Sequence, residues 1–385
     1  MKCLTGKYFF LKFFLLLDVV LLIYGTNAQC SLPPFRGAGG QTPPSGGAGG
    51  VKTGGAKTGE ANTIKIGLLI QTSSSVEARN GAQMAVDEAN KTGGFKGRKF
   101  ELVVKSMEGT WGTGSKQAVD MIFRDNVIAI LGSHDGRNAH LVEQATTKAH
   151  ITFLSAWAGD QTLSQAFTPW FFSCLPGDNT QAPALVQRIK SAGYKNITLV
   201  TDEDYDAKSG YKRFLFYAGK VNLPEPVTLE PDRLNPDYRG ICERIVTGNT
   251  DCLVLYTSPG AAGRIISLLK DMKFNTSIYG PLSLLREGSP VYFYPEIMDK
   301  ILQLSGGDWF KKKQSAFASE YYKQHGSWPG AEAAYSYDGI RTIIESVSLA
   351  GCIREDIHKA MLKIKIKGVT GSFGFDDKGN RIPLP

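Results

Sequence analysis

Several features are scarce in this chain of 385 residues, and each shortage excludes a class of protein. The formal charge is +8, but the longest basic run is Lys311 to Lys313, which indicates a solvated face rather than a nucleic-acid interface. The 43 glycines follow no fixed period, so collagen and solenoid arrays are excluded. The five histidines lack HExxH or any other metal-ligand spacing, which argues against a metal site.

The chain is nevertheless rich enough in apolar residues to fold. Hydrophobic residues make up 42% of it and aromatic residues 10%. A chain of this length and composition can bury a substantial core, with length left over for two lobes. Wholesale disorder is therefore excluded.

Residues 1–28 are predicted to form an export signal. Lys2 and Lys7 precede a long apolar stretch, and small residues follow it up to Ala28. Cleavage after Ala28 would release a soluble protein, whereas acylation of Cys30 would make a lipoprotein, and both alternatives remain open. In either case the protein is expected in the periplasm or another extracytoplasmic compartment. No later segment is long and apolar enough to span a membrane.

Residues 29–62 are predicted to be a flexible linker. Their segment GAGGQTPPSGGAGGVKTGG combines Gly-Gly and Pro-Pro pairs with hardly any large apolar side chain. Such a segment cannot offset the entropy that it would lose on ordering. The folded part of the chain is therefore expected to begin near residue 63.

After the linker, apolar β-branched runs alternate with segments of helical spacing. The first run, IKIGLLI (Ile64–Ile70), is followed by alanines at helical spacing and a Gly-Gly stop. The other runs predicted to be strands are Phe100–Val104, Val127–Leu131, Ile151–Leu154, Asn196–Thr201 and Cys252–Tyr256. This alternation is typical of a parallel sheet covered by helices, and its two series predict two α/β lobes.

The segment NGAQMAVDEANKTGGFKGRKFELVV (residues 80–104) resembles the first helix and second strand of type I periplasmic binding proteins, in particular the branched-chain amino acid and amide group. The likeness continues through ITFLSAWAGDQTLS, WFFSCLPGDNTQAPALV and AAYSYDGIRTIIESV, and it covers about residues 63–380. Members of this family are solute receptors for ATP-driven importers. Their two doubly wound parallel-sheet lobes, joined by three crossovers, close on the ligand like a clamshell.

The resemblance implies a division of the chain and a set of partners. Lobe 1 is expected to comprise residues 63–175 and 300–368, and lobe 2 residues 176–299 and 369–385. The implied partners are a small-molecule solute and an ABC permease at the membrane. A monomer without cofactor, metal or nucleic acid is expected.

Physical reasoning places a ligand site independently of the resemblance. In open parallel sheets ligands bind beyond the carboxyl ends of the strands, so the loops after the strands should carry the specific side chains. Trp111, Arg137 and Tyr205 lie in such loops and are candidate contacts, through stacking surfaces and an anion-binding guanidinium. For each of them a position on the lobe surface, away from any ligand, is the alternative.

The resemblance adds residues to this site. In the family, the loop after the third strand and the loop that matches SAWAGD bind the ligand carboxylate. This implies ligand contacts for Asp135 and Gly136 in the first loop, and for Trp157, Ala158 and Gly159 in the second.

Two positions depart from the family pattern of amino acid binders. Gly136 stands where those proteins have a serine hydroxyl, and Leu282 stands where they have the acid that pairs with the ligand ammonium. Burying an ammonium without a partner is costly. Free leucine, isoleucine and valine are therefore expected to bind weakly.

Catalysis is not expected, because no serine or cysteine lies in a nucleophile-elbow context and the glycines of GTWGTG are in the wrong order for a dinucleotide loop. A disulfide between Cys242 and Cys252 is one alternative for the cysteines, and four free thiols in the folded part are the other. Two functions remain: a transport receptor that delivers a solute to an importer, and a ligand-sensing protein of the same fold without a transport role.

Overall fold

The computed structural model describes residues 63–110, 112–165 and 169–385 of the chain. The expected export signal and linker (1–62, with Cys30) and the candidate contact Trp111 lie outside the described residues. Within the described ranges, no helix is long and apolar enough to cross a membrane.

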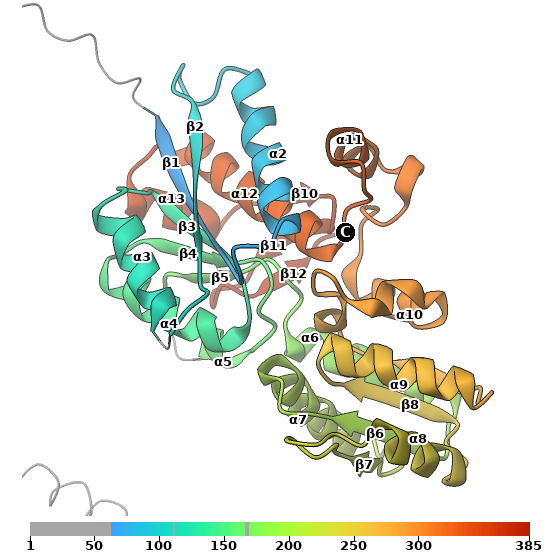
Figure 1. The fold of residues 1–385 in the computed structure, drawn as a ribbon. Helices are drawn as coiled ribbons and strands as arrows, with labels where there is room; N and C mark the ends of the chain where they lie inside the picture. The colour runs from blue at the N-terminus through green and yellow to red at the C-terminus, as the bar shows by residue number, and fades with distance from the viewer. Residues whose placement is uncertain (1–62, 111, 166–168) are drawn as a thin grey trace, which may run out of the picture. The chain divides into compact units, whose positions relative to one another are not determined.

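The first sheet is parallel throughout, with its strands in the order β2-β1-β3-β4-β5. These strands are β1 (Ile64–Ile70), β2 (Phe100–Ser106), β3 (Ala129–Ser133), β4 (Thr152–Ser155) and β5 (Phe171–Ser173). The helices that accompany this sheet are α2 (Glu77–Lys91), α3 (Thr113–Phe123), α4 (Gly136–Lys148), α5 (Thr162–Gln165), α11 (Ala316–His325), α12 (Ala331–Ala350) and α13 (Arg354–Met361) (Figure 1). We call this assembly lobe 1.

The second sheet repeats the same winding, with its parallel strands in the order β7-β6-β8-β9. Its strands are β6 (Ile197–Thr201), β7 (Val227–Leu229), β8 (Cys252–Tyr256) and β9 (Ser277–Tyr279). The helices around it are α6 (Asp178–Ala192), α7 (Tyr205–Lys220), α8 (Tyr238–Thr247), α9 (Pro259–Asp271) and α10 (Pro295–Ser305), with the 3₁₀ turns η1 (Leu282–Leu285) and η2 (Pro290–Phe293). We call this assembly lobe 2, and the two sheets confirm the predicted doubly wound α/β architecture.

Both sheets are buried on both faces, which explains the continuous apolar runs in the sequence. In β1, the side chains of Ile64, Ile66 and Leu68 pack with α2 and α12, whereas Leu69 packs with the residues of α3 and α4. α2 and α12 approach so closely that a Cβ on Gly81 would collide with the carbonyl oxygen of Ala333. The predicted strands agree with the observed ones to within about two residues because burial on two faces leaves an unmistakable apolar signal.

The C-terminal residues form a small antiparallel sheet of β10 (Ile366–Gly368), β11 (Gly371–Phe375) and β12 (Arg381–Pro383). A short 3₁₀ turn, η3 (Lys312–Gln314), precedes α11. Ser173 of β5 donates its backbone N–H to the Gly379 carbonyl, and the Phe172 ring lies 5.1 Å from that of Phe375. Conversely, α10 packs on β9 and the neighbouring turns of lobe 2. We therefore propose that lobe 1 includes the hairpin 369–385 and that residues 300–305 go with lobe 2, which changes the expected division at both places.

Three chain segments lie side by side at this place. Two of them connect the lobes, after β5 and after α10 at residues 306–309, and the third runs through Val369 and Thr370 and joins β10 to β11 within lobe 1. Asp308 donates its backbone N–H to the Val369 carbonyl, and Arg381 donates to the carbonyl of Cys174 at 2.6 Å. These contacts define the hinge of the molecule.

The disulfide between Cys242 and Cys252 is absent, so that alternative was wrong. Cys174, Cys242, Cys252 and Cys352 are all free thiols in the described residues. Cys242 on α8 packs with Leu253 and Leu255, whereas Cys252 belongs to the cluster on the other face of β8, with α6 and α7. The sheet therefore separates the two sulfur atoms, and closeness in the sequence does not bring them together.

Candidate functional site at the lobe boundary

Loops from the carboxyl ends of both sheets meet where the lobes face each other. From lobe 1 come the loops after β1, β3 and β4, and from lobe 2 come those after β6, β8 and β9. Several hydrogen bonds join the two sets directly, so the lobes are in contact in this conformation. The predicted site loops thus lie together at one boundary, as the winding of the two sheets requires.

Gly136 lies at the centre of this boundary. It is the first residue of α4, and its backbone N–H donates at 2.9 Å to Oδ1 of Asp206 from the first turn of α7. Arg286 holds the same carboxylate through Nη2 at 3.0 Å and reaches Asp204 through Nη1 at 3.2 Å. Burial raises the pKa of Asp206 to about 7, although Arg286 and the Gly136 N–H oppose that rise.

The surroundings of Gly136 also explain why it lacks a side chain. A Cβ there would lie 3.0 Å from Cβ of Asp160, 3.0 Å from a ring carbon of Tyr205 and 3.1 Å from the Asp206 carboxylate. These separations are tighter than ordinary van der Waals contact, so a serine side chain would require its neighbours to move by a few tenths of an ångström. The absence of a side chain at position 136 therefore leaves room for the Asp206 carboxylate to approach the Gly136 N–H.

A second cross-boundary contact joins Tyr205 to Asp160. The tyrosine hydroxyl donates to Oδ2 of Asp160 at 2.9 Å. His140 approaches the same oxygen through Nε2 at 3.1 Å, and Thr162 donates to Oδ1 at 2.7 Å. Burial would raise the pKa of Asp160, but these donors hold it at about 2, and the carboxylates of Asp160 and Glu143 raise the pKa of His140 to about 9. At neutral pH a charged His140 thus compensates an ionised Asp160.

Arg137 and Tyr205 lie on opposite sides of a groove at this boundary. The guanidinium carbon of Arg137 is 5.8 Å from the centre of the Tyr205 ring, a cation–π distance. The groove has a volume of about 360 Å³ and is lined by residues of both lobes, among them Arg137, Asp160, Tyr205, Lys208 and Ser209. The candidate contacts Asp135, Gly136, Arg137 and Tyr205 are therefore brought together.

The loop after β4 is more deeply buried than these residues. The Trp157 side chain is only 1% exposed and packs edge-on against Tyr335 at 6.3 Å, and its indole N–H has no hydrogen-bond partner among the described residues. The backbone N–H of Ala158 donates to Oγ of Ser155, and the Gly159 carbonyl accepts from the N–H of Asp178 in lobe 2. These interactions use polar groups that the sequence assigned to a ligand.

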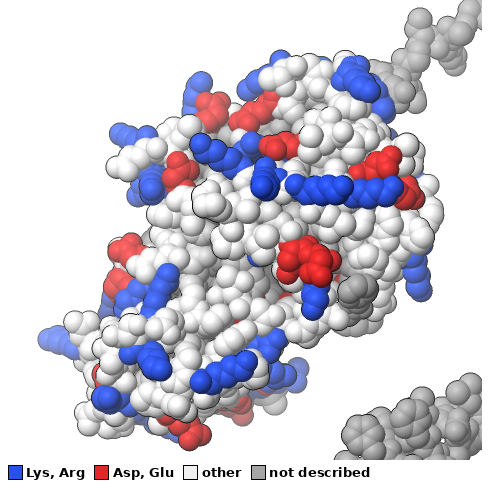
Figure 2. Space-filling view, turned by 180° about the vertical axis from the view of Figure 1, so that it is seen from behind, with Lys and Arg blue, Asp and Glu red and all other residues white. Residues whose placement is uncertain are grey.

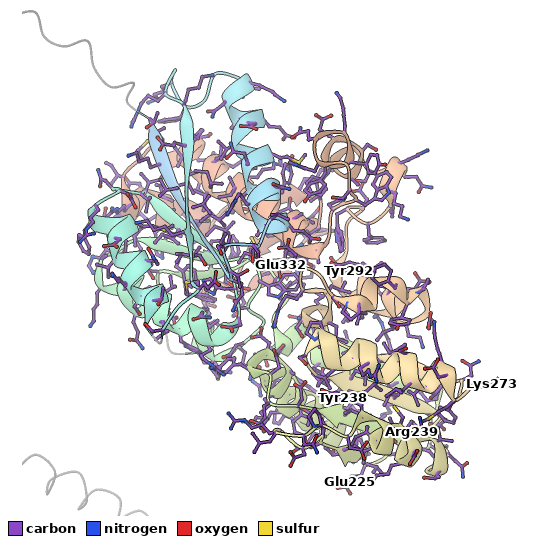
Figure 3. The ribbon with its side chains drawn as sticks, viewed as in Figure 1. Glu225, Tyr238, Arg239, Lys273, Tyr292 and Glu332 are labelled. Atoms are coloured by element: carbon purple, nitrogen blue, oxygen red, sulfur yellow. The ribbon has the colours of Figure 1, made fainter. Side chains whose placement is uncertain are left out.

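Near the turn η2, a further set of contacts crosses the boundary. Oε1 of Glu287 accepts from the backbone N–H groups of Val76 at 3.0 Å and Glu77 at 3.2 Å, at the start of α2. Oε1 of Glu332 accepts from the backbone N–H of Glu287 at 3.2 Å. The hydroxyl of Tyr292 accepts from the N–H of Ala331 at 2.9 Å. Figure 3 shows Glu332 and Tyr292 on the two sides of this contact.

Sequence reasoning missed the four residues that carry most of these contacts, namely Asp206, Arg286, Glu287 and Glu332. Asp206 belongs to the acidic segment DEDYD, which would have identified it as a charged loop facing the cleft. The other three carry no motif, and their proximity becomes visible only when both lobes are in place. Leu282, by contrast, is fully buried, and its N–H donates at 2.8 Å to Oε1 of Gln181, so the position of the expected acid is a core position here.

Charged side chains of both signs are spread over the surface. Lys and Arg side chains are interspersed with Asp, Glu and uncharged surface on the face shown in Figure 2. In the part of the chain that the structure describes, no three His, Cys, Asp or Glu side chains are arranged to hold a metal ion. The boundary offers hydrogen-bonding loops from two bodies, a geometry suited to enclosing a ligand.

Comparison with known proteins identifies the class to which this fold belongs. A family model described as periplasmic binding protein matches residues 63–384, so the chain belongs to that family. This confirms the resemblance inferred from the sequence.

Solved structures share the fold at low identity. The branched-chain amino acid transporter substrate binding protein of Streptococcus pneumoniae, solved with isoleucine, has a TM-score of 0.70 and 21% identity over 83% of this chain and 94% of that one. A solute binding protein of an ABC transporter from Rhodopseudomonas palustris, solved with 3,4-dihydroxybenzoic acid, has a TM-score of 0.69 and 18% identity over 83% of this chain and 91% of that one. These likenesses confirm the two-lobe α/β fold.

The curated relatives that match part of this chain include plant receptors. Glutamate receptor 3.4 of Arabidopsis thaliana is 18% identical over 57% of this chain, and glutamate receptor 3.1 of Oryza sativa is 26% identical over 38%. The chain spans only 23% and 16% of the length of these two proteins.

Proposed function

We propose that this protein is an extracytoplasmic solute-binding receptor. It captures a small amino-acid-like, amide or organic-acid ligand between its lobes and delivers it to an ABC importer. The observation that carries this proposal is the meeting of loops from the carboxyl ends of both sheets at one boundary. The family membership supports it, as do solved relatives described as bound to isoleucine and to an aromatic acid.

The proposed ligand contacts of this receptor are Arg137 and Tyr205, which line the groove, and the neighbouring Asp135 and Gly136, with Ala158 and Gly159 in the loop after β4. Trp157 forms a wall of the site when the lobes part, and Trp111 is a further candidate. Binding works by closure of two bodies on a hinge, so the mechanism requires no catalytic residue and the solute leaves unchanged. The export signal expected at residues 1–28 would carry the protein out of the cytoplasm, either soluble after cleavage at Ala28 or anchored through Cys30.

A ligand screen by thermal unfolding tests the proposal. A ligand that binds only the folded protein stabilises it by RT ln(1 + [L]/Kd), about 2.7 kcal/mol at a hundredfold excess over Kd. The ligand is expected to be among the amides, urea and aromatic acids. Leucine, isoleucine and valine should bind weakly, because Leu282 replaces the acid that pairs with the ligand ammonium in amino acid binders. If no solute of these classes raises the melting temperature, the proposal is wrong.

A matched pair of variants places the site. Tyr205→Ala removes a ring at the groove and should weaken ligand binding, whereas Tyr217→Ala removes a ring from the same helix at a position away from the boundary and should leave binding unchanged. Equal binding by both variants and the unchanged protein would exclude this groove as the ligand site.

The second candidate function is ligand sensing without transport, and the likeness to plant glutamate receptors favours it. The two functions differ in their partner. A receptor for transport stimulates ATP hydrolysis by its reconstituted permease when ligand is present. A ligand-dependent complex with a sensor or channel, and no effect on an importer, would favour sensing.

A further inference from the structure

Two long helices of lobe 1 begin without a cap of their own. The residue before α2 is Val76 and the residue before α12 is Gly330, and neither provides a side-chain hydrogen bond to the first turn. The first N–H groups of any helix lack partners within the helix, so they require a side chain, water or another segment.

Lobe 2 provides both missing caps from one short segment. The carboxylate of Glu287 accepts from the N–H groups of Val76 and Glu77, and the hydroxyl of Tyr292 accepts from the N–H of Ala331 in the first turn of α12. Tyr292 is itself held in place, because its hydroxyl donates to the Leu285 carbonyl at 2.8 Å. The caps therefore exist only while the lobes are in contact.

The segment 286–292 belongs firmly to lobe 2. Pro290 packs so closely on α9 that a Cβ on Gly263 would collide with its ring, and the Tyr294 hydroxyl donates to the Gly263 carbonyl at 3.4 Å. Opening of the lobes would consequently carry Glu287 and Tyr292 away from the two helices. The segment itself need not unfold.

The charges around this contact are poorly balanced. Glu77 on α2, Glu287 on the segment and Glu332 on α12 bring three carboxylates together, and Oε2 of Glu77 and of Glu287 are buried without a hydrogen-bond partner among the described residues. Of the neighbouring cations, Arg286 is already paired with Asp204 and Asp206. The remaining groups that face the contact are neutral hydroxyls. Ser133 at the end of β3 donates to Glu332, and the hydroxyls of Tyr292 on η2 and Tyr321 on α11 accept from Ala331 and Asn80.

We propose that residues 286–292 form a latch that holds the lobes closed by capping α2 and α12 from the opposite lobe, and that the latch takes up protons as it closes. The proposal rests on the hinge motion of the proposed function, but it requires no ligand. It assigns Glu287 and Tyr292 as positioning residues of the closed form.

The direction of the pH dependence follows from burial. Burial, together with the charges of Glu287 and Glu332, raises the pKa of Glu77 from 4.5 to about 8, and burial raises the pKa of Glu332 to about 7. In the open form both carboxyl groups would face water and recover ordinary values. The closed form therefore binds more protons between these limits, so closure is favoured as the pH falls and is weakened as the pH rises through 7 to 8.

The test is a distance measurement on the full chain without ligand. Fluorescent probes attached to unnatural residues at positions 83 on α2 and 273 on lobe 2 report the ratio of open to closed molecules by energy transfer. The closed fraction should increase as the pH falls from about 9 to about 6. Glu287→Ala and Tyr292→Phe should each increase the ratio of open to closed molecules, by about fivefold for the loss of one cap.

Matched controls and folding checks make the result decisive. Glu225→Ala and Tyr238→Phe change the same residue types in lobe 2, away from the latch (Figure 3), and should leave the ratio unchanged. Tyr292→Phe removes a single oxygen, so it keeps the test valid if Glu287→Ala fails to fold. A ratio that does not respond to pH, or that responds equally in the latch and control variants, would overturn the proposal. A failed ligand screen would count against the receptor function alone.

Discussion

Two buried clusters of polar and charged side chains lie near the lobe boundary, and they are built in opposite ways. At the hinge, Asp338 of α12 accepts from the N–H groups of Val369 and Thr370 and from the Thr370 hydroxyl. Arg381 donates to the carbonyls of Cys174 and Thr370 and to the same hydroxyl, which lies between the two charged groups. At the latch, by contrast, three carboxylates gather, and two of their oxygens have no hydrogen-bond partner among the described residues.

The difference indicates which contact is permanent and which is conditional. A fully hydrogen-bonded network with balanced charge is stable when buried, whereas buried carboxylates without a cation are costly unless they take up protons or return to water. The hinge cluster is not separated by opening, because Asp338, Thr370 and Arg381 all belong to lobe 1. The latch can return its carboxylates to water by opening, because its two sides belong to different lobes.

The largest expected effect comes from breaking the hinge. Asp338→Ala leaves the N–H groups of Val369 and Thr370 buried without their acceptor and removes the negative charge near Arg381, so the free energy of unfolding should fall by about 3–5 kcal/mol. Urea unfolding measures the change. Asp356→Ala, on the neighbouring helix α13, removes an exposed carboxylate and should change stability by less than about 0.5 kcal/mol. Similar losses in the two variants would contradict the special role of the hinge network.

A backbone substitution sharpens the same contrast. Gly307 in the second connection has φ of +72°, and a Cβ on it would collide with the Val369 carbonyl. Gly307→Ala should therefore cost about 1–3 kcal/mol for the collision, in addition to about 1 kcal/mol for the left-handed backbone.

Gly326 is the matched position for this measurement. It ends α11 with φ of +71° and has no atom within 4 Å of its Cβ position. Gly326→Ala should thus show the backbone cost alone, about 1 kcal/mol. If the two alanine variants unfold at the same urea concentration, Gly307 is not packed against the Val369 carbonyl as tightly as described.

The sequence predicted the sheets far better than the latch, for a physical reason. Strands such as β1 and β8 are buried on both faces, so their apolar residues form runs that a local pattern can recognise. Arg137 and Tyr205 were singled out because they lie in loops that follow such strands, whereas Gly136 was implied by the family resemblance. Contacts at the carboxyl ends of the strands are thus within reach of sequence reasoning.

The residues of the latch carry no such signal. Glu287 accepts a hydrogen bond from the N–H of Glu77, which lies 210 residues away in the sequence. Their proximity depends on the angle between the two lobes. Glu332 reads as an ordinary polar residue near the start of an amphipathic helix. Trp157 was predicted to form a wall of the site, and in this conformation its ring packs against Tyr335. Its role as a ligand contact remains a prediction.

A smaller effect is expected from the pH dependence of unfolding. Burial raises the pKa values of Glu77 and Glu332 from 4.5 to about 8 and about 7. The stability that depends on their protonation is therefore complete below 4.5 and is lost as the pH rises from there through the raised values. Because the lobes can open instead of unfolding, the loss between about pH 6 and about pH 8.5 should be limited to about 1 kcal/mol.

Glu332→Gln keeps the acceptor for the Glu287 N–H and removes the titrating group, so urea unfolding of this variant should depend less on pH over the same range. Glu345→Gln, an exposed position on the same helix, is the control and should retain the slope of the unchanged protein. A steeper slope in Glu332→Gln would mean that the charge of Glu332 supports the closed form, contrary to the comparison drawn here.

The smallest expected effect, none at all, concerns the thiols, because the comparison between hinge and latch assumes that no covalent bond supports either region. Cys242 and Cys252 lie on opposite faces of the second sheet, and burial raises their pKa values to about 11 and about 12. A native disulfide typically contributes about 2–4 kcal/mol. A reducing agent that broke one would lower the melting temperature by several degrees, since about 1 kcal/mol corresponds to about 2–4 °C in domains of about 150–250 residues. The melting temperature should therefore be the same with and without reductant, and alkylation of the unfolded, unreduced protein should modify Cys174, Cys242, Cys252 and Cys352. A protected pair among these four would place a covalent link inside a lobe, and stability measured on the hinge variants would then include its contribution.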